Sequence, residues 1–189
     1  MKKERLETFS DSMIAILMTV MVLGLRIPRG SSLASLSPLL PQLGCYVISF
    51  GALGIYWNNH HHLLHAAERI NGRILWANLH LLFWLSLVPF VTGWTGENGF
   101  ASLPTAVYGA VLFFAAVAYW ILKIELVRAQ GPGSKLAAVI GADLKGKLSI
   151  VLYAAAIPLA FLEHWIAWGV YLAVALIWFV PDKRLEAIF

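Results

Sequence analysis

The sequence predicts an all-α, polytopic membrane protein, and three observations lead to this fold class. Of the 189 residues, 60% are hydrophobic and 13% are charged, whereas an ordinary soluble domain has about 25% charged residues. The charged residues divide the chain into apolar stretches close to the length of about 20 residues that crosses ~30 Å of hydrocarbon. The basic residues alternate between dense and sparse segments, as in loops on the two sides of a membrane.

Six transmembrane helices are expected, all within one domain that covers residues 1–189. The first three are expected over about 7–27, 38–64 and 74–95. Ser37-Pro38 is typical of an N-cap and first helical position, and Pro89 predicts a kink in the third helix. The last three are expected over about 104–127, 148–162 and 165–180. The final two are short for membrane spans, and as a hairpin they return the chain to the side from which it came.

The distribution of Lys and Arg predicts the orientation of these helices. With a cytoplasmic N-terminus, 12 basic residues fall in cytoplasmic segments: Lys2, Lys3, Arg5, Arg69, Arg73, Lys123, Arg128, Lys135, Lys145, Lys147, Lys183 and Arg184. The outside loops then hold Arg26 and Arg29. We therefore expect a multi-pass protein of the plasma membrane, surrounded by the lipid bilayer, with both termini in the cytoplasm. The basic residues do not gather on one face with interleaved aromatics, so no nucleic-acid partner is expected.

The first helix combines an acidic residue near its start with an apolar stripe. At about 100° per residue, four side chains fall within roughly 100° of one another: Ile16, Thr19, Val20 and Leu23. By itself, such a stripe more often faces lipid or another helix than a functional site. Asp11 lies about 140° from Ile16 and is expected to point at a neighbouring helix. A carboxylate at this depth is normally paired, lines water, or faces the helix dipole at the interface.

Three patterns in the first half of the chain are more specific. Arg5, Phe9, Ser10 and Asp11 form the sequence Arg-x-x-x-Phe-Ser-Asp. Trp-Asn-Asn-His-His-His follows at 57–62, and Leu-Ser-Leu-Val-Pro-Phe at 85–90 precedes Gly96-Glu97. Together they resemble the motifs of the transmembrane protein 175 family of cation channels. The resemblance covers about residues 5–97, and it extends to the end of the chain in helix count and hydropathy alone.

The resemblance implies a potassium-preferring channel in which four identical chains line one pore with their first helices. Matched by position, it implies that Ile16 and Leu23 form a hydrophobic constriction, with Thr19 and Val20 on the turns between them. A ring of apolar side chains gates by dewetting, and a ring of Thr19 hydroxyls can replace part of the hydration shell of a cation. Potassium ions are then the permeating species, and no cofactor is required.

The resemblance also implies a polar network on the cytoplasmic side that fixes the pore helix. Its expected members are Arg5, Phe9, Ser10, Asp11, His60 and His61. The histidines have two interpretations: interfacial residues hydrogen-bonded to Asp11, which we favour, and metal ligands.

Three other classes of protein remain open from the residues themselves. His61 and His65 stand at i, i+4, a spacing that suits a membrane-embedded metal-binding protein, but no other strong ligand spacing supports a metal site. A secondary transporter is disfavoured, because the charged residues fall at segment edges or in loops rather than in mid-membrane. An assembly subunit without conduction is the third. No catalytic residues are expected, and the protein is not expected to be an enzyme.

Overall fold

The computed structural model describes residues 2–131, 133–141 and 143–179, and the regular elements within these ranges are all helices. The predicted all-α fold class is therefore confirmed. In chain order, the elements are α1 (Lys3–Leu23), the 3-10 helix η1 (Leu33–Leu39), α2 (Leu40–His65), α3 (Gly72–Ser86), α4 (Val88–Glu97), α5 (Ser102–Gln130), α6 (Lys135–Ile140), α7 (Leu144–Leu162) and α8 (His164–Phe179).

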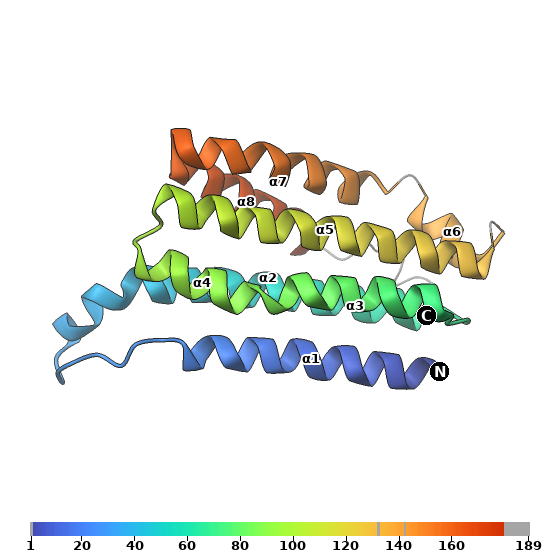
Figure 1. Ribbon diagram of the computed structural model, residues 1–189, viewed down its shortest axis with the longest axis horizontal. Coiled ribbons are helices and arrows are strands. Elements are labelled where there is room, and N and C mark those ends of the chain that lie inside the picture. The colour runs from blue at the N-terminus through green and yellow to red at the C-terminus, as the bar shows by residue number, and fades with distance from the viewer. Residues whose placement is uncertain (1, 132, 142, 180–189) are drawn as a thin grey trace.

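The long helices run side by side, with α1 along one edge of the bundle and α7 along the opposite edge (Figure 1). We call the end of the bundle at which α1 starts the N-terminal end, and the other the far end. In the described part of the chain, five helical segments are long and apolar enough to cross a membrane: Lys3–Leu23, Leu33–His65, Gly72–Glu97, Ser102–Gln130 and Leu144–Leu162. α8 is apolar but has 16 residues, so six complete spans stay a prediction.

α1 begins and ends four residues earlier than the expected range 7–27. The expected end assumed that Arg26 marks the membrane interface. Instead the helix stops at Leu23, and Pro28 disfavours a helical conformation at the residue before it. Arg26 consequently lies in the connection to η1, where its side chain reaches another helix.

Prolines determine the boundaries of the second and third membrane segments. Pro38 lies inside η1, and Pro41 lies in the first turn of α2, where its missing N–H has no helical partner to lose. The expected start at 38 is therefore two residues early. Pro89 lacks the N–H that would bond to the carbonyl of Leu85, and the third segment divides at Leu87 into α3 and α4.

The last three long helices differ from expectation mainly in length. α5 extends beyond 104–127 at both ends, and α7 begins four residues before the expected 148. The side chain of Asp143 accepts a hydrogen bond from Gly146 N and caps this earlier start. Residue 180 lies outside the described residues, as do Lys183 and Arg184 on which part of the predicted orientation rests.

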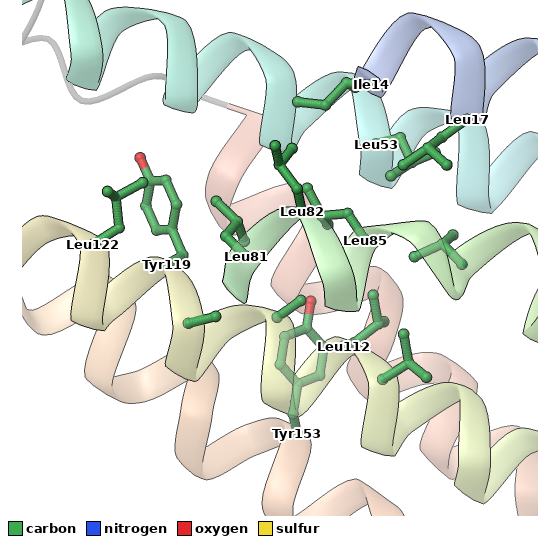
Figure 2. Close-up of a cluster of buried hydrophobic side chains, with 14 of the residues drawn as sticks. Ile14, Leu17, Leu53, Leu81, Leu82, Leu85, Leu112, Tyr119, Leu122 and Tyr153 are labelled. Carbon is green, nitrogen blue, oxygen red and sulfur yellow. The ribbon is translucent and has the colours of Figure 1, made fainter. Parts of the chain in front are cut away.

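Buried hydrophobic side chains, many of them leucine and tyrosine, form the core of the bundle, and Figure 2 labels members from α1, α2, α3, α5 and α7. Its fully buried members include Ile14 of α1, Leu53 of α2, Leu81 of α3 and Leu122 of α5. α8 joins this core through α5, because Gly109 leaves room for the ring of Tyr171, whose hydroxyl donates to the carbonyl of Thr105 at 3.1 Å. The core therefore holds α1 by one side at the edge of the bundle.

Candidate functional site

α1 packs against the bundle with one face and leaves the opposite face uncovered. The buried face consists of Leu6, Ser10, Ile14, Leu17 and Met21, which follow one another at steps of three or four residues. Ile16 is 55% exposed, Val20 44% and Leu23 81%, and Thr19 is exposed between them. Packing within one chain therefore leaves all four residues of the predicted stripe uncovered.

The uncovered face carries a hydroxyl between two apolar side chains. The Thr19 hydroxyl donates a hydrogen bond of 2.8 Å to the carbonyl of Ile16 one turn earlier. This bond uses the hydroxyl proton, so the lone pairs of the oxygen remain available as acceptors. Ile16 and Leu23 flank this oxygen along the helix, and their aliphatic side chains cannot hydrogen-bond to water.

A buried hydrogen-bond network joins α1, α2 and α3 toward the N-terminal end. Asn78 Nδ2 donates to the hydroxyl of Ser10 at 2.9 Å, and Asn78 Oδ1 lies 2.7 Å from His60 Nε2. Ser10 donates its own proton to the carbonyl of Leu6, so its oxygen serves as the acceptor for Asn78. With the amide in this orientation, His60 carries its proton on Nε2. All three side chains are almost completely buried.

Asp11 contacts α2 through a tryptophan rather than a histidine. Trp57 Nε1 donates to Asp11 Oδ1 at 3.0 Å. His61 stacks on the Trp57 ring with centroids 6.0 Å apart, and on His65 at the same separation. The expected hydrogen bond between Asp11 and a histidine is therefore replaced by one to Trp57, and His61 supports that tryptophan from one turn further along α2.

The structure does not bring Arg5 and Phe9 into this network. Both lie on the uncovered face of α1, in line with Ile16, and Phe9 is 46% exposed. The Arg5 side chain makes no hydrogen bond or ion pair with the described part of the same chain. Lys3 instead joins this end of α1 to α2, since its Nζ donates to the carbonyl of His65 at 2.5 Å.

A second set of polar contacts holds α1 at the far end of the bundle. Gln42 Nε2 donates to the carbonyl of Gly24 at 2.9 Å, and its Oε1 accepts from the backbone N–H of Arg26 at 3.2 Å. These two bonds satisfy backbone groups just beyond the last turn of α1. The guanidinium Nε of Arg26 lies 3.0 Å from a carboxylate oxygen of Glu97 at the end of α4.

Gly96 lets α4 approach this anchor closely. A Cβ atom at this position would lie 2.7 Å from the Cα of Gln42, a contact that real structures essentially never contain. One turn away, the Thr92 hydroxyl lies 2.7 Å from Ser49 Oγ, which lies 3.0 Å from the Tyr108 hydroxyl. α2, α4 and α5 are therefore bonded to one another behind the far half of α1.

Sequence reasoning missed Asn78 and Gln42 as residues that position α1. A signal existed in each case, because each is an amide side chain inside a segment otherwise rich in apolar residues, and polar groups in membrane helices usually have partners. No feature of the sequence identified the partners, which lie 68 and 18 positions away. Among the described residues, no group of three or more His, Cys, Asp or Glu side chains is arranged to hold a metal ion.

The apolar helices and the one-sided burial of α1 define a polytopic membrane protein built as a helical bundle. The family model described as endosomal/lysosomal potassium channel TMEM175 matches residues 5–89. A relative from Chryseobacterium sp. (strain P1-3), named as a potassium channel, is 52% identical over 98% of this chain and 97% of its own length. The chain belongs to the TMEM175 family, which is a family of ion channels and not of enzymes.

Two further comparisons agree with this assignment. A protein from Chamaesiphon minutus, also named as a potassium channel, is 25% identical over 91% of each chain. The crystal structure of a lysosomal potassium-selective channel TMEM175 homologue from Chamaesiphon minutus superimposes with a TM-score of 0.82, at 24% identity. It covers 95% of this chain and 97% of the crystallised one, so the whole described bundle shares its fold.

Proposed function

We propose that four copies of this chain assemble into a potassium channel whose pore is lined by the uncovered faces of the four α1 helices. The names of the relatives support potassium as the ion. The uncovered face supports the assembly, because it presents exposed apolar side chains on a helix whose other side packs against α2, α3 and α4. Around a four-fold axis, this face becomes a continuous lining to which each chain contributes the same residues.

Conduction through this lining is controlled by the rings of Ile16 and Leu23. A narrow ring of aliphatic side chains expels water, so a cation passes after the ring widens. Val20 extends the apolar wall on the intervening turn. The four Thr19 oxygens lie between the two rings and offer polar ligands to an ion that has lost part of its hydration shell.

The polar contacts at the two ends of α1 have a positioning role in this proposal. Ser10 and Asp11, through Asn78, His60 and Trp57, hold the N-terminal end against α2 and α3. His61 packs on the same tryptophan, whereas Arg5 and Phe9 are available to contact a neighbouring copy. None of these residues acts as a selectivity ring, so their removal alters assembly or gating before it alters the choice of ion.

The channel is proposed to lie in the plasma membrane with the N-terminal end of the bundle in the cytoplasm. Lys2, Lys3, Arg69 and Arg73 are at that end, whereas Arg26 and Arg29 are at the far end. This asymmetry agrees with the tendency of basic residues to remain on the cytoplasmic side.

Reversal potentials in mixed potassium and sodium, measured for wild type, Leu23→Ala and Val22→Ala, test the proposal. We expect the wild-type reversal potential to follow the potassium gradient. Leu23→Ala widens the constriction and should increase the current severalfold. Val22 is also exposed on α1 but lies outside the stripe, so Val22→Ala should conduct like wild type. Absence of current from both wild type and Leu23→Ala would contradict the channel assignment.

A secondary transporter is the main alternative, and single-channel recording distinguishes it. A pore gives unitary current steps in a planar bilayer, whereas a carrier moves ions without resolvable steps. A metal-binding protein is a weaker alternative, and elemental analysis of the purified protein tests it through the stoichiometry of bound metal.

A further inference from the structure

We infer that a groove between α5, α6 and α7 at the N-terminal end of the bundle binds an anionic phospholipid from the surrounding leaflet. The groove has a volume of about 290 Å³. Its lining combines an apolar wall, which includes Trp120, Ile124 and Ile140, with the basic residues Arg128 and Lys147. Neither the proposed pore nor the contacts that hold α1 involve these residues.

The depth of the groove matches the headgroup region of a bilayer. α5 has 29 residues and is about 43 Å long, so it exceeds the ~30 Å of hydrocarbon by about nine residues. With the start of α5 at the opposite interface, Arg128 stands at headgroup depth and Trp120 just inside the hydrocarbon. α7 has 19 residues, which span about 28 Å, so its start at Leu144 lies near the same interface. Lys147, one turn further along, can extend its long side chain toward that interface.

The charges of the groove favour an anion. Its only acidic lining residue in the described part of the chain, Asp143, forms an ion pair with the buried Lys123, which also faces the rings of Tyr119 and Trp178 at 5.1 and 5.4 Å. The carboxylate is thereby neutralised and does not repel a phosphate. Arg128 bonds to Glu125 through Nη1, and a guanidinium has five N–H donors in all. The Lys123–Asp143 and Arg128–Glu125 ion pairs are each neutral as a whole, so the exposed Lys147 gives the mouth of the groove its excess positive charge.

The location of the groove favours lipid over a second copy of the chain. α7 lies at the edge of the bundle opposite α1 (Figure 1). If α1 faces a central axis, α5, α6 and α7 border lipid at the periphery. Basic pockets between membrane helices on the cytoplasmic side are suited to anionic headgroups, which are enriched in that leaflet. The apolar wall then contacts the upper part of an acyl chain while Arg128 and Lys147 contact the phosphate.

Native mass spectrometry of the full chain in detergent tests this inference with dioleoyl phosphatidylglycerol and dioleoyl phosphatidylcholine as probes. We expect wild type to bind the anionic lipid at least about tenfold more tightly. Arg128→Gln/Lys147→Gln should lose most of this preference. Lys2→Gln/Arg69→Gln removes two charges from the same end of the bundle outside the groove and should retain it. Ala137→Trp fills the groove while keeping its charges, and should weaken binding of the anionic lipid.

Equal affinity of wild type for the two lipids would overturn the inference, and this result needs no variant to fold. Equal losses in the two double variants would show a diffuse charge effect in place of a site. Unchanged binding by Ala137→Trp would exclude the groove, and displacement of the lipid by millimolar inorganic phosphate would identify a site for free anions. Because lipid binding is measured without current, failure here leaves the proposed channel function untouched.

Discussion

At the scale of single residues, a buried amide determines how three helices meet. Asn78 bonds to Ser10 with its nitrogen and to His60 with its oxygen, so one side chain links α1, α2 and α3. Hydrogen bonds between membrane helices contribute about 0.6 kcal/mol each on average and up to about 1.7 kcal/mol. The two hydrogen bonds of Asn78 together therefore contribute on the order of 1 kcal/mol to stability. Their geometry also fixes the rotation of α1.

Asn78→Ala is expected to lower the melting temperature of the purified protein by about 2–4 °C, the shift that accompanies the loss of roughly 1 kcal/mol in a chain of this size. Asn98→Ala serves as the matched control, since Asn98 is an exposed residue that bonds to the carbonyl of Trp94 within its own turn. Thermal unfolding in detergent gives the measurement. Equal melting temperatures for the two variants would show that the network does not stabilise the bundle.

Individual residues also show how far the sequence predicts the site. The stripe of Ile16, Thr19, Val20 and Leu23 follows from helical periodicity, because its positions depend on one helix alone. The partner of Asp11 was expected to be a histidine and is Trp57, one turn before the histidine cluster. Trp57 and His61 lie on adjacent turns of α2, so the sequence pattern alone does not distinguish them as partners of Asp11. The rotation of α1 and its position along α2 decide which of the two Asp11 contacts.

At the scale of elements, close packing of α4 on α2 depends on one glycine. Gly96 faces the Cα of Gln42, and Gln42 bonds to the chain just beyond α1. The backbone of α4 is therefore part of the support for the far end of α1. α1 itself has no such close contact at Gly24, where an added Cβ would meet only a carbonyl oxygen of its own helix at 3.5 Å.

Gly96→Ala should destabilise the protein, because the new Cβ forces α4 away from Gln42 by several tenths of an ångström. Overpacking of this kind typically costs about 1–3 kcal/mol. Gly93→Ala is the matched control on the same helix, since no atom lies within 4 Å of its added Cβ, and alanine favours the helix by about 0.5–1 kcal/mol. Melting temperatures should therefore move in opposite directions, and a loss of stability in both variants would contradict this account.

Helix boundaries were predicted less well than helix existence, and the errors have local causes. The charge of Arg26 predicts a helix that continues to about position 27, whereas α1 stops at Leu23, because Pro28 constrains the connection more than the charge does. Pro38 and Pro41 are both compatible with a helix start, and η1 accommodates the first of them. Composition places a segment in the membrane, but backbone geometry determines its first and last residues.

At the scale of the whole molecule, the face of α1 that carries Ile16, Thr19, Val20 and Leu23 is not covered by any other part of the described chain. α1 packs against α2, α3 and α4 with one side, and its other side faces outward at the edge of the bundle (Figure 1). The same chain carries exposed apolar side chains on α7 and α8, which suit contact with lipid. The proposed tetramer assigns these two apolar surfaces to different surroundings, one at the axis and one at the periphery.

Oxidative crosslinking of cysteine variants distinguishes these surroundings. Leu23→Cys should give disulfide-linked dimers, because four copies meet at the constriction. Leu176→Cys, at a position on α8 that is 70% exposed, should give none. The native Cys45 is completely buried and should not contribute. Gel electrophoresis without reductant gives the result, and equal crosslinking of both variants, or a monomeric mass in native spectrometry, would contradict the tetramer.

The sequence by itself determined the membrane class, the approximate positions of the helices and the stripe on α1, because hydropathy and helical periodicity are local properties. Tertiary structure decided which side of that helix is covered, through contacts between residues far apart in the chain, such as Ser10 with Asn78. It also decided that Gln42 and Gly96 support the far end of α1. Such partners depend on the relative rotation and height of packed helices, which no local pattern encodes.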